Sequence, residues 1–454
     1  MSKRNFILLI IISILVVIAV FGFLYFQKGT TAPGDNSGGT NFFSQFNPFG
    51  NNNKPTPPVT TPPVDVSGYI PPVTNTPVLK LIKISSMPIA GFAVFQKERL
   101  KEVPTVITNP TPTLPLSGEG VPPAKGGSGG QTKKPTPPPT EFAPALRYVD
   151  IATGNIYQTF ADKIKEQKFS STIIPKVHDA YFGNHGESVV MRHLKGNDRT
   201  IETFVGTLPK ELLGADVTGN NEIKGNFLPD NVKDISISPD TSKVFYLFDS
   251  GDDMIGVILN LLTNKKTQIF DSPFTEWLSL WPTANLITLS TKPSANIPGY
   301  IYSMDGSGKN LTKILGEING LTTLASPNGK LILYGDSNLS INIYHTDTRN
   351  SDVLGVKTLP EKCVWGKASD TIYCAVPKLI NIGEYPDTWY QGEMSFNDQI
   401  WKIDVKTGNG TMILDPVTIA VGEIDGIKLA LDDSGNYLFF VNKKDSYLWE
   451  FSLK

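Results

Sequence analysis

The chain has 454 residues, enough for several ordinary domains or one large repeat domain, and its charge is nearly balanced, with 41 Lys and Arg against 43 Asp and Glu. The basic residues are scattered along the chain, which argues against a nucleic-acid partner. Four His and two Cys leave little material for zinc or iron–sulfur sites, so we expect neither a metal centre nor a cofactor.

A long apolar run lies near the start of the chain. Residues 6–26 are uncharged and almost wholly apolar, which matches the ~20 residues that a helix needs to cross a bilayer. A cleaved signal peptide would have a shorter apolar core followed by small residues, whereas this run ends in LYFQK. Because Lys3 and Arg4 precede the run, the positive-inside rule predicts that residues 1–5 are cytoplasmic. We therefore expect a single-pass protein of the cell membrane whose remainder is extracytoplasmic.

The composition changes abruptly after this run, since 22 of the 35 prolines fall between residues 27 and 145. Residues 27–63, rich in Pro, Gly and Asn, cannot bury enough apolar surface to fold and are predicted to be a disordered stalk. A second such tract at 100–144 is predicted to be a disordered insertion in a folded domain that covers 64–454. Between the tracts, residues 78–99 carry two short apolar runs of strand type.

The rest of the chain is repetitive. An apolar run, a small-residue turn and a second apolar run recur, as in ISISPDTSKVFYLF from 235 and TLASPNGKLILYG from 323. A second hairpin usually follows, as in RYVDIATGNIYQTF from 147 and YIYSMDGSGKNLTKIL from 300. Two hairpins give four antiparallel strands in roughly 40 to 45 residues, the spacing of propeller blades. The pattern predicts an all-β protein with a β-propeller fold.

The string GSGK at 306–309 lies in the turn of one of these second hairpins. A phosphate-binding P-loop needs GxxxxGK followed by Ser or Thr at the start of a helix. In this chain position 303 is Ser, position 310 is Asn, and a strand is predicted to follow. The string is therefore interpreted as a hairpin turn, whose Asp and Gly residues suit positive φ.

Seven blades account for the repeats, and they are predicted to begin near residues 78, 177, 234, 276, 320, 362 and 427. In this scheme residues 78–99 are the first hairpin of blade one, with its turn at 85–90. VDVSGYI at 64–70 could supply the fourth strand of the last blade. If 78–99 is not part of a blade, the ring has six blades.

Three stretches resemble the repeats of TolB-type, WD40-like propellers: SPDTSKVFYL, SPNGKLILY and IYSMDGSGKNLT. The resemblance covers roughly 230–454 well and 145–230 less closely, and it departs at Thr241, where the family pattern has glycine. It implies the propeller fold, and it leaves function open because propellers host enzymes, receptors and scaffolds.

The longest departure from the repeat, at 377–398, concentrates Tyr385, Trp389, Tyr390 and Phe396 in a segment expected to be a loop. Aromatic residues with polar tips are favoured at recognition surfaces, so these four are the candidate binding residues. The alternative is that they pack back onto the blade, because a long ordered loop needs a core of its own.

Two further pairs stand out in the predicted hairpins. His178 and His193 fall opposite each other in the expected register and could begin a metal site, although no third ligand is apparent. Cys363 and Cys374 are expected to face each other directly, at a Cα separation of ~4.5 to 5.5 Å that a disulfide can span. An oxidising compartment would favour that disulfide, and two buried thiols are the alternative.

These features favour a membrane-anchored, extracytoplasmic propeller that binds a protein, peptide or glycan, or acts as a scaffold, at the cell envelope. An extracytoplasmic hydrolase or lyase with a site at one ring face is the second hypothesis, and a structural subunit of an envelope complex is the third. No catalytic residue is assigned, because no GxSxG, HExxH or Cys/His nucleophile pair appears. Converging carboxylates or His in the central funnel would favour the enzyme, and an apolar rim would favour binding.

Overall fold

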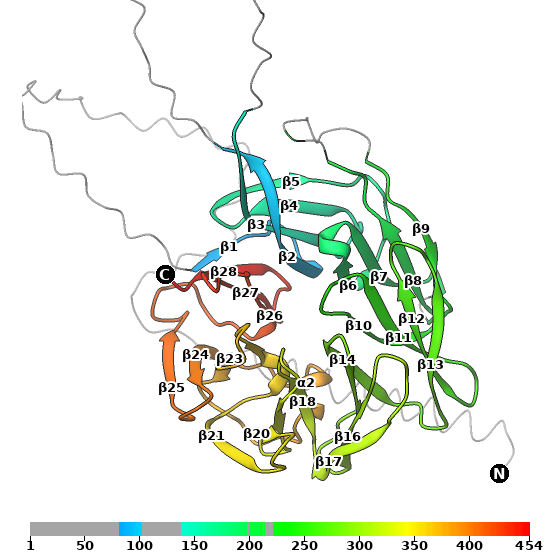
Figure 1. Ribbon diagram of the computed structural model, residues 1–454. Helices are drawn as coiled ribbons and strands as arrows, with labels where there is room; N and C mark the ends of the chain where they lie inside the picture. The colour runs from blue at the N-terminus through cyan, green and yellow to red at the C-terminus, as the bar shows by residue number, and fades with distance from the viewer. Residues whose placement is uncertain (1–80, 102–137, 198, 212, 214–220) are drawn as a thin grey trace, which may run out of the picture. The chain divides into compact units, whose positions relative to one another are not determined.

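A computed structural model of the chain describes residues 81–101, 138–197, 199–211, 213 and 221–454. Within the compact unit of residues 75–454, the described strands form seven four-stranded antiparallel sheets (Figure 1). Six sheets use consecutive strands, and the seventh combines the last three strands with the first one. The predicted all-β, seven-bladed propeller is thus confirmed over the six-bladed alternative.

The blades are numbered from the N-terminus, and the strands of each blade follow one another from the innermost outward. The first three blades are β2 (Ile89–Leu100), β3 (Thr140–Asp150), β4 (Ile156–Phe160), β5 (Lys163–Lys168); β6 (Val177–Gly183), β7 (Ser188–Leu194), β8 (Ile201–Thr207), β9 (Lys224–Phe227); and β10 (Val232–Ile237), β11 (Lys243–Asp249), β12 (Met254–Asn260), β13 (Lys266–Ser272). The next three are β14 (Trp277–Thr283), β15 (Leu286–Thr291), β16 (Pro298–Met304), β17 (Thr312–Asn319); β18 (Thr322–Ala325), β19 (Leu331–Gly335), β20 (Ser340–His345), β21 (Ser351–Lys357); and β22 (Cys363–Trp365), β23 (Thr371–Pro377), β24 (Asp398–Asp404), β25 (Gly410–Leu414). Blade seven is β26 (Gly426–Leu431), β27 (Tyr437–Asn442), β28 (Leu448–Ser452) and β1 (Leu81–Lys83).

The hydrophobic cores lie between neighbouring blades, and strand β11 shows why. Its sequence KVFYLFD is apolar on both faces, and side chains alternate between the two faces of a strand. Val244 and Tyr246 therefore pack into the core shared with blade two, while Phe245 and Leu247 pack into the core shared with blade four. Each blade is sandwiched in this way, so continuous apolar strands are expected in place of a strict apolar–polar alternation.

The ring closes through strand β1, which pairs antiparallel with β28 (Figure 1). This corrects the prediction that residues 78–99 form one hairpin. β2 pairs instead with β3, from Ile89 opposite Asp150 to Leu100 opposite Thr140. β2 is the innermost strand of blade one and has a single partner in that blade, which is β3. β1 therefore does not pair with β2 and is instead the fourth strand of blade seven. The predicted closing strand at 64–70 lies outside the described residues.

Most other strand predictions from residue 177 onward are confirmed. The blades begin at Val177, Val232, Trp277, Thr322, Cys363 and Gly426, each within two residues of the predicted position. GSGK lies between β16 and β17, where Gly308 has a φ of 78° and the Asp305 carboxylate accepts hydrogen bonds from the backbone of the turn. The hairpin interpretation therefore holds.

Several predicted segments lie outside the described residues: the cytoplasmic residues 1–5, the apolar run 6–26, the stalk 27–63 and most of the insertion 100–144. The predicted bounds of that insertion are wrong at both ends, because Leu100 is the last residue of β2 and residues 140–144 begin β3. Among the residues that the structure describes, no helix is both long and apolar enough to cross a bilayer.

A buried carboxyl group lies at the closing seam. Glu450 in β28 is 3% exposed and stands between Phe439 of β27 and Ile82 of β1. Its Oε2 atom is buried without a hydrogen-bond partner among the described residues. Burial, with smaller contributions from Asp162 and Asp432, raises the pKa of Glu450 to about 8. The group is therefore protonated in the folded protein at neutral pH.

This carboxyl predicts a pH-dependent stability. The unfolded chain ionises Glu450 above its ordinary pKa, while the fold keeps it neutral up to about pH 8, so the free energy of unfolding falls across that interval. Glu450→Gln removes the effect and should stabilise the protein by at least ~1 kcal/mol more at pH 8.5 than at pH 4.5, since one pKa unit corresponds to ~1.4 kcal/mol. Chemical unfolding at the two pH values measures it. Asp433→Asn, an exposed carboxylate of the same blade, is the control, and an equal effect of Glu450→Gln at both pH values would contradict the assignment.

Candidate functional site

The innermost strands of the blades surround a central cavity of about 570 Å³. Apolar side chains make up much of its wall, contributed by β2, β6, β10, β14 and β26: Phe92, Ala93, Ala180, Phe182, Ile235, Ile237, Leu278, Leu280, Leu429 and Ala430. Charged and hydroxyl-bearing side chains complete the lining: Tyr181, Asp234, Ser279, Thr323, Glu361 and Lys428. All seven blades contribute to this lining. Blade five does so through Thr323, and blade six through Glu361, which lies in the short 3-10 turn directly before β22.

A charged network lies on one side of the cavity, between blades seven and two. Lys428 Nζ donates to Asp179 Oδ1 at 2.6 Å and to the Ala90 carbonyl at 2.7 Å. Tyr181 and Arg192 donate to the other carboxylate oxygen, at 2.6 and 3.5 Å. Burial opposes ionisation, but Lys428, Tyr181 and Arg192 together outweigh it and hold the pKa of Asp179 below its usual range. Asp179 is therefore an ionised and fully partnered carboxylate.

Lys428 takes its position from an irregular backbone. It lies at a register shift between Ile427 and Ala430 in the β26–β27 ladder, and its φ is 52°. Positive φ is uncommon for residues other than glycine and costs conformational energy. The bulge lets the ammonium group of Lys428 bridge from blade seven to Asp179 in blade two.

Two other carboxyl groups line the cavity with neutral partners. Asp234 Oδ2 accepts hydrogen bonds from the backbone N–H and the hydroxyl of Ser279, both at 2.6 Å. Glu361 Oε1 accepts one from the Tyr390 hydroxyl. Burial raises the pKa of both carboxyl groups, and each is raised further by a nearby acid, Asp179 for Asp234 and Asp234 for Glu361. They form a second polar region, distinct from the Asp179 network.

The four predicted aromatic binding residues belong to the loop 378–397, between β23 and β24, which contains the short helix α2 (Asp387–Tyr390). Tyr385, Trp389 and Phe396 are buried together, with ring centroids 5.7 to 6.3 Å apart. Tyr390 is 37% exposed and reaches the cavity wall through Glu361. Three of the four thus pack back onto the ring in one core with Leu339 and Leu359, and Tyr390 alone contacts a residue of the cavity lining.

A buried ion cluster fixes this loop to the ring. Lys362 Nζ contacts Asp398 Oδ2 at 2.7 Å and also Asp425 Oδ1, and all three side chains are fully buried. Asp425 Oδ2 accepts from Trp389 Nε1 at 3.0 Å, and Asp398 Oδ2 from the Gly426 N–H at 2.7 Å. Burial raises the pKa of Asp398 to about 6. Removing one partner of such a cluster would leave a buried uncompensated charge, which is strongly destabilising.

The loop also contacts blades four and seven. Asp387 Oδ2 accepts from the Ala295 N–H at 2.6 Å and from the Ser294 hydroxyl at 3.2 Å. Lys443 lies over the Trp389 ring at 4.4 Å and donates to the carbonyl of the same residue. These contacts hold Tyr390, and through it Glu361, in a fixed position beside the cavity.

The histidine pair is not aligned as predicted. Phe182 faces Val189, as expected, but a register shift between Val177 and Asp179 places His193 opposite Val177. His178 is exposed, whereas the Nε2 atom of His193 lies 3.7 Å from Glu202. In the described part of the chain, no group of three or more His, Cys, Asp or Glu is arranged to hold a metal ion.

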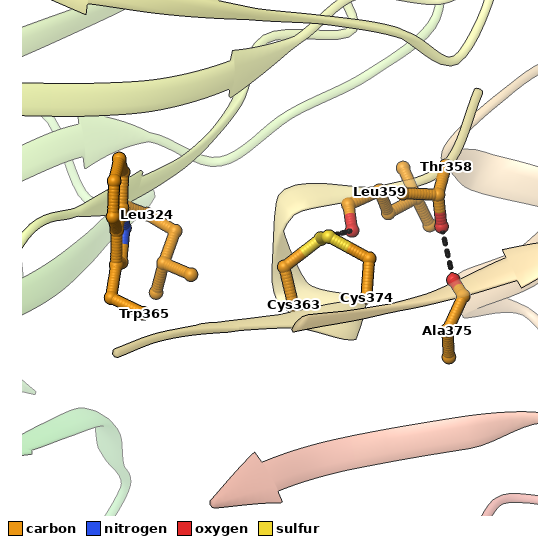
Figure 2. The surroundings of a disulfide bond; sticks show 7 residues. All are labelled: Leu324, Thr358, Leu359, Cys363, Trp365, Cys374 and Ala375. Atoms are coloured by element: carbon orange, nitrogen blue, oxygen red, sulfur yellow. Dashed lines mark hydrogen bonds between the residues drawn. A yellow bond between two sulfur atoms is a disulfide. The ribbon is translucent and has the colours of Figure 1, made fainter. Parts of the chain in front are cut away.

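Cys363 and Cys374 are directly opposed in the β22–β23 ladder, with Cα atoms 4.0 Å apart and the Sγ atoms joined in a disulfide (Figure 2). Thr358 donates to the Ala375 carbonyl (Figure 2). Trp365, on the same strand as Cys363, donates to the Leu324 carbonyl. The pair lies in the core between blades five and six, away from the cavity lining.

Sequence reasoning did not single out Asp179, Asp234, Glu361 or Lys428. Each stands alone in its own repeat, and only ring closure brings the four together. The usable signal was their position, because Asp179, Asp234 and Lys428 are each the third residue of an innermost strand. Counting charged residues at that register position in every repeat would have found three of them.

No protein family matches the chain, and no curated protein sequence matches it. Solved structures with a similar arrangement include an oligogalacturonate lyase in complex with manganese, at 9% identity and a TM-score of 0.43 over 68% of this chain and 85% of that chain. An oligogalacturonate lyase from Vibrio parahaemolyticus has the same identity and TM-score over 68% of this chain and 86% of that one. A chain of a mitotic checkpoint complex has 13% identity and a TM-score of 0.43 over 68% of this chain and 87% of that chain. Likenesses this distant carry no inference about activity.

Proposed function

We propose that the protein is a membrane-anchored, extracytoplasmic propeller that binds a ligand of the cell envelope in its central cavity. The observation that carries the binding role is the convergence of all seven blades on one cavity of about 570 Å³, whose wall combines apolar side chains with Asp234, Glu361 and Lys428. Concave, mostly apolar sites with a few placed polar groups are typical of ligand binding. The apolar run at 6–26 supports the anchor.

The cavity wall is held in place before any ligand arrives. Lys428 and Asp179 join blades seven and two, and the loop 378–397 holds Tyr390 against Glu361. A preorganised site avoids the entropy cost of ordering side chains on binding. The ligand is a protein segment, a peptide or a glycan of the envelope.

An extracytoplasmic hydrolase or lyase is the second candidate, and one observation favours it. Asp234 and Glu361 line the same cavity, and burial raises the pKa of both, as in carboxyl pairs that perform acid–base chemistry. The two candidate functions predict different effects of Asp234→Asn on the binding and turnover of the natural ligand. It should weaken binding in a binding module, and it should spare binding but stop turnover in an enzyme.

The anchor and location predict that protease added to intact cells cuts the stalk at 27–63 and releases the propeller. The outer surface must first be shown to be accessible, and full protection of the chain would then contradict the proposed topology.

Thiol labelling of the denatured, unreduced chain gives a second readout of the proposed location. Cys363 and Cys374 should both resist alkylation, because the proposed compartment preserves a disulfide, and labelling of both would count against it.

The binding role predicts a specific crosslink from the cavity. A photo-crosslinking amino acid in place of Leu280, which lines the cavity, should capture a defined envelope component when the full chain is irradiated in its own cells. The same group in place of Val353, which is exposed on the outermost strand of blade five, is the matched control. Equal capture at both positions, or none at Leu280, would refute cavity binding.

A further inference from the structure

The charges around the central cavity are unequally compensated. Asp179 is paired with both Lys428 and Arg192. Asp234 and Glu361 form no ion pair with any Lys or Arg that the structure describes, and their hydrogen-bond donors, Ser279 and Tyr390, are neutral. Arg192 and Lys362 act on their pKa values only from a distance, so both carboxyl groups line the cavity without a described cation in contact.

Each of these carboxyl groups also has an unused acceptor. The described residues donate to Oδ2 of Asp234 and to Oε1 of Glu361, and to neither Oδ1 of the first nor Oε2 of the second. Both residues line the cavity, so a bound ligand can reach them. A carboxylate accepts up to about four hydrogen bonds, which leaves capacity for donors of a ligand.

The rest of the wall limits the shape of such a ligand. Ile235 lies next to Asp234, and Leu278, Leu280 and Phe92 belong to the same lining. An apolar body placed against these side chains would be removed from water, which is favourable by about 25 cal/mol per Å². The one cation of the lining, Lys428, uses two of its three N–H donors on Asp179 and on a carbonyl, and Asp179 already balances its charge, so it offers an anionic ligand little attraction.

We propose that the central cavity binds a ligand with a primary ammonium or guanidinium group attached to an apolar body, the cation lying against Asp234 and Glu361. This inference rests on the proposed function and names the ligand class of the same site. Hydrogen bonds between a cation and carboxylates are about twice as strong as neutral ones, and water exclusion strengthens them further. The cation also relieves the repulsion between the two acids.

Three probes with one apolar chain and different head groups test the proposal: hexylamine, 1-hexanol and hexanoate. The full chain is held in zwitterionic lipid nanodiscs, with empty discs as the blank, and binding is followed by saturation-transfer NMR. Hexylamine should bind at least about tenfold more tightly than 1-hexanol, and hexanoate should not bind. Equal affinity for the amine and the alcohol would overturn the proposal.

Variants assign the effect to the two carboxyl groups. Asp234→Asn and Glu361→Gln should each weaken hexylamine binding about tenfold and leave 1-hexanol unchanged. Asp271→Asn, an exposed carboxylate on the outer strand of the same blade as Asp234, should change neither affinity. Unchanged amine binding in both cavity variants would refute the assignment.

A second route covers the case in which these variants fail to fold. Leu280→Lys keeps both carboxyl groups and places a fixed cation in the lining, so it should abolish amine binding; retained binding would contradict the proposal. A result against the amine ligand class can be distinguished from a result against cavity binding itself. If Leu280 crosslinks an envelope component while hexylamine does not bind, the cavity binds a ligand of another class.

Discussion

Pairing of β1 with β28 is the contact on which the rest of the ring depends. Leu81, Ile82 and Lys83 face Phe451, Glu450 and Trp449 in an antiparallel ladder. Without this strand, β28 would be an unpaired edge, which natural sheets avoid. Leu81 packs into the core between blades six and seven, and Ile84 into the core between blades seven and one. A few residues from the start of the fold therefore complete two cores and join its two ends.

Closure of the ring also determines which charged side chains lie at the cavity. Asp179, Asp234 and Lys428 lie far apart in sequence, and each is an ordinary charged residue near the start of a strand. The ring brings these starts around one axis, where Lys428 of β26 reaches past β2 of blade one to Asp179 of β6. Asp234 and Glu361 are left with hydroxyl and amide donors only. The site is thus a consequence of the ring, and no single blade contains it.

The loop 378–397 shows how a binding surface and a structural core can have the same composition. Its aromatic residues suggested recognition, yet Tyr385, Trp389 and Phe396 are each about 3 to 4% exposed. The loop is long and has little secondary structure of its own, so it needs apolar side chains to hold it. The Lys362 cluster beneath it was invisible in the sequence, because its two aspartates come from β24 and the start of blade seven.

Local patterns predicted local structure well in this chain. The turn residues and apolar runs located the hairpins from Val177 onward, and the register of Cys363 and Cys374 followed from their neighbours. Residues 78–99 misled because two adjacent strand-like runs look like a hairpin, whereas a propeller assigns its first strand to the last blade. The register shift beside His178 was equally hidden, since a bulge depends on backbone geometry. Long-range pairing and convergence at the axis are properties of the closed ring.

Ring closure is tested most directly by measuring how two neighbouring substitutions in β1 change the free energy of unfolding of the protein. Leu81 is 2% exposed and fills a core, whereas Ile82 on the same strand is 37% exposed. Leu81→Ala should lower the free energy of unfolding by about 2 to 4 kcal/mol, as for other buried leucines, while Ile82→Ala should change it by less than ~1 kcal/mol. Equal effects of the two substitutions, or no loss for Leu81→Ala, would contradict closure of the ring by β1.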